Sequence, residues 1–105
     1  MIRPEIIIKA YHPNHKALQE IIAGIEEEGI LYKVILDEVP EAETTLGLVA
    51  SELSQLGVGI GMNAENTTLY IQKIRNAPLY ATTKEYRAIG QNAARYVKGN
   101  PLIEI

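Results

Sequence analysis

Three consecutive glutamates, Glu26, Glu27 and Glu28, are the most unusual local feature of this 105-residue sequence. They lie at the end of a predicted helix, where the aligned peptide dipoles already place partial negative charge, so each carboxylate there is unfavourable. Glutamate oxygens are also ligands for hard divalent cations. The triplet therefore indicates either a well-solvated helix end or a surface that meets a cation or a partner.

Glu27 is the member of the triplet that we expect to point outward. The apolar stripe of the same helix consists of Leu18, Ile21, Ile22 and Ile25, spaced as on one helical face. At about 100° per residue, Glu27 lies nearly opposite this stripe, while Glu26 and Glu28 flank it. We expect the counter-charge of Glu27 to come from another polypeptide.

A basic face is predicted on the last helix, opposite that helix's own apolar stripe; it carries Arg87, Gln91, Arg95 and Lys98. Arg95 and Lys98 lie near the helix end, where the dipole favours cations. The face is either solvated or a docking surface for an acidic partner.

Other candidate groups give weak signals. His12 and His15 are the only histidines, and with no cysteine in the chain a metal site would need further ligands. The glycine-rich run 57–61 fits neither nucleotide-binding pattern, because a strand rather than a helix follows it. Close packing against another backbone explains these glycines better. We find no nucleophile and base pair and no facing carboxylates, so we predict no catalytic residues and no cofactor bound by this chain alone.

Composition narrows the class of protein. The formal net charge of −3 at pH 7 argues against a nucleic-acid binder that works by bulk charge. We see no signal peptide, and the longest aliphatic run, residues 6–8, is far too short to span a bilayer. We therefore expect a cytoplasmic protein with no membrane contact.

The elements that position these residues follow from periodicity. Strands are expected at residues 5–10, 31–36, 58–62, 67–72 and 78–81. The three helices are expected to end at Gly29, Gly57 and Gly99; the second begins at Thr44 or Thr45 and the third at Thr82 or Thr83, with Glu85 completing a capping box. The order βαβαβββα predicts one α/β domain over 1–105, with helices on a mostly parallel sheet and an antiparallel element at an edge.

Four segments together resemble the small subunit of the diol and glycerol dehydratase reactivases. They are Gly24-Ile25-Glu26-Glu27-Glu28-Gly29-Ile30, Val58-Gly59-Ile60-Gly61, Ala77-Pro78-Leu79 and Arg87-x-x-Gly90-x-Asn92-Ala93-Ala94-Arg95-x-Val97-Lys98-Gly99-x-Pro101. Each segment alone is weak, but their order and spacing cover most of the chain. The segment around His12 and His15 does not match a firm family pattern.

The resemblance implies a fold like that of the dehydratase β subunit and a non-catalytic, chaperone-like role. In this family a small subunit joins a large actin-like ATPase subunit in a heterotetramer, which uses ATP to release damaged cobalamin from inactivated dehydratase. The small subunit is thought to exchange places with the dehydratase β subunit, and so to meet the dehydratase α subunit transiently. By position, Glu27 would reach a divalent metal, Mg²⁺ or Ca²⁺, held mainly by the large subunit.

Together with Glu27, we expect Glu26, Glu28, Arg87, Arg95 and Lys98 to lie at the partner interface. Residence in a bacterial microcompartment stays open. Two alternatives remain. One is a stand-alone α/β module that binds a small ligand or RNA through the crevice at its strand ends, with the basic face as its best supporting feature. The other is an accessory subunit of the dehydratase itself.

Overall fold

The computed structural model describes residues 4–74, 77–80 and 84–105. Within these residues, four strands and three helices follow one another, with the bounds β1 Ile6–Tyr11, α1 His15–Glu27, β2 Tyr32–Asp37, α2 Glu43–Leu53, β3 Val58–Met62, β4 Thr67–Ile71 and α3 Tyr86–Lys98. The predicted α/β class is confirmed.

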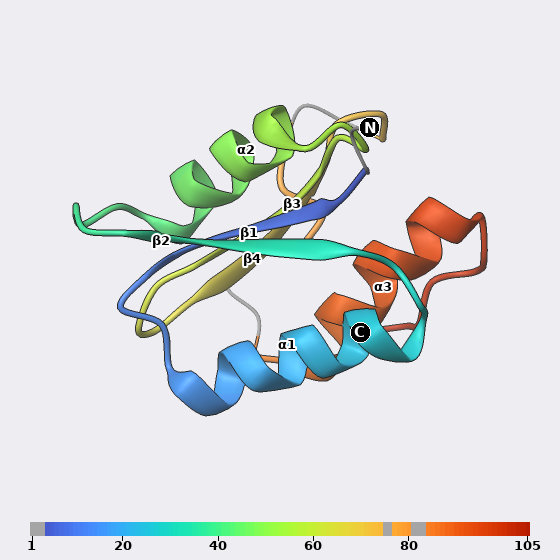
Figure 1. Cartoon of the computed structure of the whole chain (residues 1–105), viewed down its shortest axis with the longest axis horizontal. Coiled ribbons are helices and arrows are strands. Elements are labelled where there is room, and N and C mark those ends of the chain that lie inside the picture. The colour runs from blue at the N-terminus through green and yellow to red at the C-terminus, as the bar shows by residue number, and fades with distance from the viewer. Residues whose placement is uncertain (1–3, 75–76, 81–83) are drawn as a thin grey trace.

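The sheet has the strand order β2-β1-β3-β4. β1 pairs in parallel with both β2 and β3, whereas β4 pairs antiparallel with β3 at the edge, as predicted from the turn between them. The connection from β1 through α1 to β2 runs toward one edge of the sheet, and the connection from β2 through α2 to β3 runs back toward the other edge. Because such connections are right-handed, α1 and α2 lie on opposite faces of the sheet. Figure 1 shows the resulting three layers, with α2 above the sheet and α1 and α3 below it.

The main core lies between the sheet and the layer of α1 and α3. Alternate residues of the strands face this layer, among them Ile8 and Ile60, which are fully buried. From the helices, Ile21, Ile25 and Ile89 meet them and are equally buried. The apolar stripe predicted for the first helix is therefore the face that packs.

Glycines let α2 lie directly on β3. A Cβ added to Gly59 would stand 2.1 Å from the backbone nitrogen of Ser51, and one added to Gly61 would stand 2.1 Å from that of Gly47. Real Cβ atoms do not approach a backbone so closely, so only glycine fits at these strand positions. The prediction that another backbone passes close to the glycine-rich run is confirmed.

Glycines also bring α1 and α3 together. A Cβ on Gly24 would lie 2.3 Å from the carbonyl oxygen of Arg87, and a Cβ on Gly90 would lie 2.1 Å from that of Ile21. The two helix backbones therefore touch (Figure 1). This contact brings the polar side chains beside it within reach of one another.

Both ends of α2, the start of α3 and one strand differ from the prediction. α2 begins at Glu43 after Ala42, not at Thr44 or Thr45, and it ends at Leu53 with Ser54 as its C-cap, before Gly57. α3 begins at Tyr86; Thr82 and Thr83 lie outside the described residues, and the N-cap residue Glu85 makes no side-chain capping bond. Of the predicted strand 78–81, Ala81 is likewise outside, and the pairing seen is a single bridge between Tyr80 and Leu69.

Lys9, a polar residue within an aliphatic strand, is explained by its neighbour across the sheet. It forms an ion pair with Asp37 at the end of β2, and both side chains are largely buried.

None of the helices in the described ranges is long and apolar enough to cross a membrane.

Candidate functional site

The end of α1 puts the three glutamates beside α3. Asn14 caps the start of α1 by accepting a hydrogen bond from the Ala17 backbone nitrogen, 3.1 Å away. The helix ends at Glu27, with Glu28 as its C-cap and Gly29 at a φ of +74°. Because α1 and α3 touch through glycines, the carboxylates of this last turn reach the basic side chains of α3.

Four side chains form the first of two polar groups, here called the Glu27 cluster: Glu20, Glu27, Arg87 and Gln91. Arg87 donates from one terminal nitrogen to Glu27 Oε1 and from the other to Glu20 Oε2, the second bond being 2.8 Å long. Gln91 Nε2 donates to Glu27 Oε2 at 2.7 Å. Both carboxylate oxygens of Glu27 therefore accept a hydrogen bond from α3.

Arg87 is held electrostatically by this cluster. The hydrogen bond to Glu20 raises its pKa; burial acts in the opposite direction, and the charges of Glu20 and Glu27 add to the increase. Its Nε atom, however, is buried and has no hydrogen-bond acceptor among the described residues. The guanidinium is thus fixed through its two terminal nitrogens alone.

Glu28, Arg95 and Lys98 form the second group, the Glu28 cluster. Arg95 Nε lies 3.1 Å and Lys98 Nζ 3.3 Å from the two carboxylate oxygens of Glu28. Burial acts to raise the pKa of Glu28, but the hydrogen bond from Lys98 and the charge of Arg95 together outweigh it, and the pKa is lowered. The Glu28 side chain is 13% exposed, against 44% for Glu27.

The expectation that Glu27 must find its counter-charge on another polypeptide is wrong. Arg87 of the same chain supplies it, because the packing of α1 on α3 turns the predicted basic face toward α1. The unfavourable charge at the end of α1 is therefore compensated internally. Glu27 is nonetheless not enclosed, since almost half of its side chain remains exposed.

Glu26 lies apart from both clusters. Its side chain is exposed, and it lines an open hollow of about 380 Å³ together with Gly29, Ile30, Leu31 and Tyr32. The outward direction predicted for Glu27 alone is thus shared with Glu26. The structure brings together five of the six predicted site residues and leaves Glu26 beside them.

Glu20 is a residue of this site that the sequence reasoning missed, and Gln91 was noted there without a role. Glu20 and Glu27 are seven residues apart, which places both on one helix face about two turns from each other. The seven-residue spacing of the two glutamates was the signal present in the sequence. It indicates a shared site only once Arg87 of the neighbouring helix is known to bridge the two carboxylates.

Arg87, Arg95 and Lys98 were also the best feature of the RNA-binding alternative. All three are paired with glutamates of α1. A surface whose cations already have internal counter-ions offers little net positive charge to phosphates. That alternative therefore loses its main support.

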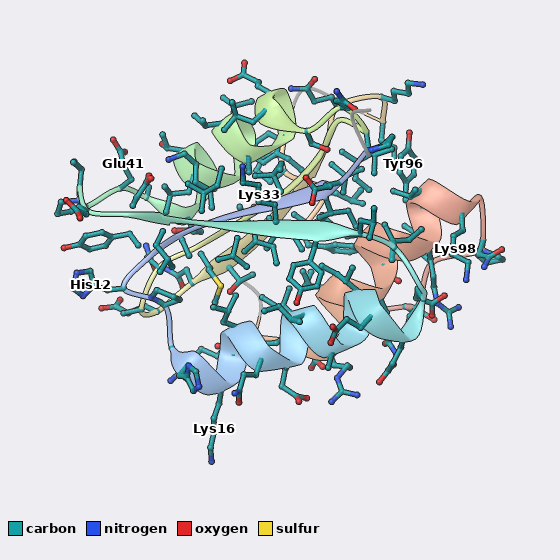
Figure 2. All side chains as sticks on the ribbon, viewed as in Figure 1. His12, Lys16, Lys33, Glu41, Tyr96 and Lys98 are labelled. Atoms are coloured by element: carbon teal, nitrogen blue, oxygen red, sulfur yellow. The ribbon has the colours of Figure 1, made fainter. Side chains whose placement is uncertain are left out.

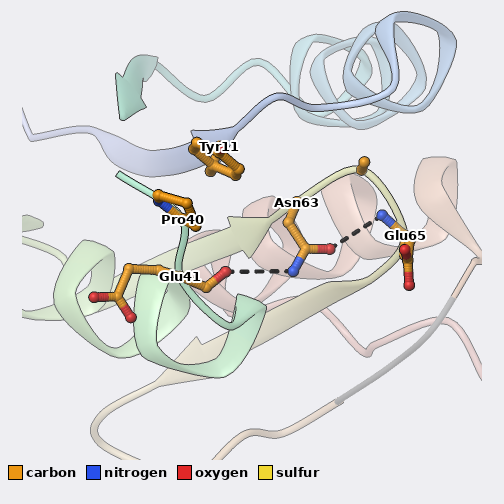
Figure 3. Close-up of a pocket in the computed structure, with 6 residues that line it drawn as sticks. Tyr11, Pro40, Glu41, Asn63 and Glu65 are labelled. Carbon is orange, nitrogen blue, oxygen red and sulfur yellow. Dashed lines mark hydrogen bonds between the residues drawn. The ribbon is translucent and has the colours of Figure 1, made fainter. Parts of the chain in front are cut away.

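A second hollow lies where the strand order reverses, at the carboxyl ends of β1 and β3 (Figure 3). It measures about 260 Å³ and is lined by Tyr11, Pro40, Glu41, Asn63, Ala64 and Glu65. Asn63 donates to the Glu41 carbonyl at 3.4 Å and accepts from the Glu65 nitrogen at 3.0 Å. The side chain of Asn63 thus joins the two loops that border this hollow.

The two histidines do not form a metal site with other described residues. His12, in a left-handed conformation at a φ of +44°, stacks at a tilt against Tyr11, and His15 contacts Gln19. Among the described residues, no three or more His, Asp or Glu side chains converge in a way that could hold a metal ion. A divalent cation that reaches Glu27 would therefore need further ligands from elsewhere.

Comparison with known proteins places this geometry in a family. A family model described as the dehydratase medium subunit matches residues 3–103. The chain belongs to this family. The match spans nearly the whole sequence, including both helices of the polar clusters.

Two relatives come from Citrobacter freundii. The chain is 34% identical over 108 residues to a propanediol dehydratase-reactivating factor small subunit, covering 96% of this chain and 91% of the relative. It is 31% identical over 97 residues to a probable glycerol dehydratase-reactivating factor small subunit, covering 86% and 83%. The resemblance inferred from the four sequence segments is confirmed.

The fold of this family member has a solved counterpart. A chain of a diol dehydratase-reactivating factor, determined in complex with ADP and Mg²⁺, superposes with a TM-score of 0.85 at 28% identity. The alignment covers 98% of this chain and all of that one. The α/β arrangement described above is therefore that of a reactivating-factor chain over its full length.

Proposed function

We propose that this chain is the non-catalytic small subunit of an ATP-dependent reactivating factor for a diol or glycerol dehydratase. The observation that carries the proposal is the end-to-end match in sequence and fold to reactivating-factor small subunits. In this role the chain pairs with a large ATPase subunit, forms a heterotetramer with it, and works in the cytoplasm. Nucleotide and Mg²⁺, present in the solved counterpart, belong to the complex rather than to this chain alone.

The proposed action is the release of damaged cobalamin from an inactivated dehydratase by exchange with its β subunit. The chain contributes a rigid α/β body and one adaptable surface at the end of α1. Exchange requires a surface that is stable when exposed, and the paired charges of α1 and α3 provide this because they leave few isolated charges. The chain itself performs no bond-breaking step in this scheme.

Glu27 is the residue that we propose to act at the large-subunit interface. Its oxygens are hard donors of the kind that Mg²⁺ accepts, and its side chain is accessible. Mg²⁺ takes near-octahedral coordination, so one carboxylate from this chain can complete a shell that the partner mainly supplies. The cation would then join the two polypeptides.

Co-expression with the cognate large subunit, followed by size-exclusion chromatography, tests the proposal. We expect the two chains to elute together and the complex to restore activity to inactivated dehydratase when ATP and fresh cobalamin are added. The chain alone should do neither. A chain that elutes as a monomer beside its large subunit would refute the proposal.

The family description supports a second candidate, an accessory subunit of the dehydratase itself. Both candidates share the fold, so the partner decides between them. Affinity purification from the native host distinguishes the two: recovery with the dehydratase core, in the absence of an ATPase subunit, would favour this second role.

A further inference from the structure

In the Glu27 cluster, the guanidinium of Arg87 is bound to the carboxylate of Glu27. In the proposed function, a divalent cation of the partner binds the same carboxylate. Arg87 and Gln91 take both oxygens of Glu27. A divalent cation bound at Glu27 would stand close to the Arg87 guanidinium, and the two positive charges repel each other. Binding of an external cation at Glu27 therefore favours withdrawal of Arg87.

We propose that Arg87 is an internal counter-ion that occupies Glu27 in the free subunit and withdraws to Glu20 when Glu27 accepts a partner's divalent cation. This inference rests on the proposed function. It assigns roles to Arg87 and Glu20, and it makes Glu27 an exchangeable site rather than a permanently open one.

The bridging geometry supports the exchange. Arg87 uses different terminal nitrogens for Glu27 and Glu20, so it can leave the first acceptor while retaining the second. Its charge then stays compensated throughout. Its buried Nε has no acceptor among the described residues, so no hydrogen bond at that atom opposes the movement.

The Glu27 cluster, in which we propose the exchange, is more exposed to solvent than the carboxylate of the Glu28 cluster, which stays paired. The side chains of Glu20, Glu27 and Arg87 are 49%, 44% and 42% exposed. Ion pairs in such positions are screened by water and contribute little to stability. Glu28, at 13% exposed and held by two cations, keeps the end of α1 attached to α3 while Arg87 moves.

The test measures affinity for the large subunit in Mg²⁺ and in EDTA, using the full-length chain. For Arg87→Gln, which removes the competing charge, we expect Mg²⁺-dependent binding to become about three- to tenfold tighter. For Glu20→Gln, which removes the place to which Arg87 withdraws, we expect binding to weaken by a similar factor. A purely structural role for the cluster would shift both variants in the same direction.

Two controls isolate the mechanism. Lys16→Gln removes a positive charge from an exposed side chain that projects away from α1 (Figure 2), so it reports any general effect of net charge and should change little. Arg87→Gln introduced into the Glu27→Gln background should have no further effect, because the competition has already been removed. Urea midpoints of the free variants confirm that each one is folded.

The outcomes separate this inference from the function on which it rests. If the wild-type chain forms no complex with the large subunit, both are overturned. If it forms a complex of equal affinity in Mg²⁺ and in EDTA, the counter-ion role is wrong while the subunit role stands. If the wild type shows Mg²⁺-dependent binding and Arg87→Gln leaves it unchanged or weakens it, the counter-ion role is again wrong while the subunit role stands. Tighter binding with Arg87→Gln that persists without Glu27 would also overturn the counter-ion role.

Discussion

Gly90 of α3 lies against Ile21 of α1 so closely that an added Cβ would stand 2.1 Å from the Ile21 carbonyl oxygen. This contact sets the separation of the two helices. All the pairs of the Glu27 and Glu28 clusters that join α1 to α3 depend on that separation, because their side chains bridge the same two helices.

Replacement of this glycine should therefore destabilise the protein. Gly→Ala inside a helix ordinarily stabilises by roughly 1 kcal/mol, but at Gly90 the methyl group meets backbone that cannot rotate away. We expect Gly90→Ala to lower the free energy of unfolding by roughly 1–3 kcal/mol, measured by urea denaturation. Gly24→Ala should act in the same direction, since its Cβ would stand 2.3 Å from the Arg87 carbonyl oxygen. Exposed Gln19→Ala serves as the control, and a stabilising Gly90→Ala would contradict the contact.

Glu28 should make stability depend on pH. Because its pKa is lowered in the folded state, its contribution is complete above the ordinary glutamate value of about 4.3 and is lost as the pH falls through the lower folded value. At pH 7 we expect Glu28→Gln to have a lower urea midpoint than the wild type. The two midpoints should converge only as the pH falls below the lowered folded pKa of Glu28, where the wild-type carboxyl is itself neutral. Glu38→Gln, in an exposed loop, should show no such convergence.

Asn92 should anchor the segment after α3. The side chain is fully buried and makes two bonds with Ile103, donating to its carbonyl oxygen at 2.8 Å and accepting from its backbone nitrogen at 2.6 Å. We expect Asn92→Ala to cost about 1–3 kcal/mol of unfolding free energy and to speed hydrogen exchange at the Ile103 amide. Asn100→Ala, at an exposed position, is the matched control. Unchanged exchange at Ile103 would argue against the anchor.

Glu27→Gln should weaken the complex with the large subunit in a metal-dependent way. The amide keeps the shape of the side chain but removes the charge that a cation needs, so we expect roughly ten- to hundredfold weaker binding in Mg²⁺. In EDTA the variant and the wild type should bind alike. Glu52→Gln, on the exposed face of α2, is the control. Equal affinities in Mg²⁺ would exclude Glu27 from the metal's coordination.

The architecture was largely predictable from sequence because its determinants are local. The strand at 58–62 was predicted with the bounds that the structure shows, and Gly99 ends α3 in a left-handed conformation as expected. The start of α2 was missed because two threonines offered capping hydroxyls that the chain does not use there. The helix begins at Glu43 instead, without a side-chain capping bond.

The candidate site was only half predictable. Periodicity shows which face of each helix is polar, and it correctly separated the charged residues of α1 and α3 from their cores. It does not show which polar faces meet. That depends on how the two helices pack, and the packing follows from Gly24 and Gly90, whose significance appears only when both are seen in contact. The internal partner of Glu27 was therefore missed.

The pairs that join α1 to α3 lie between 60 and 70 residues apart in the chain. Because synthesis proceeds from the N-terminus, α1 emerges long before α3, and its acidic end has no basic partner until every strand of the sheet has been made. A growing chain thus presents a negatively charged helix end and an incompletely covered apolar layer together. Completion of α3 compensates this helix end and covers this layer at once, because the same helix carries both the basic side chains and the apolar stripe.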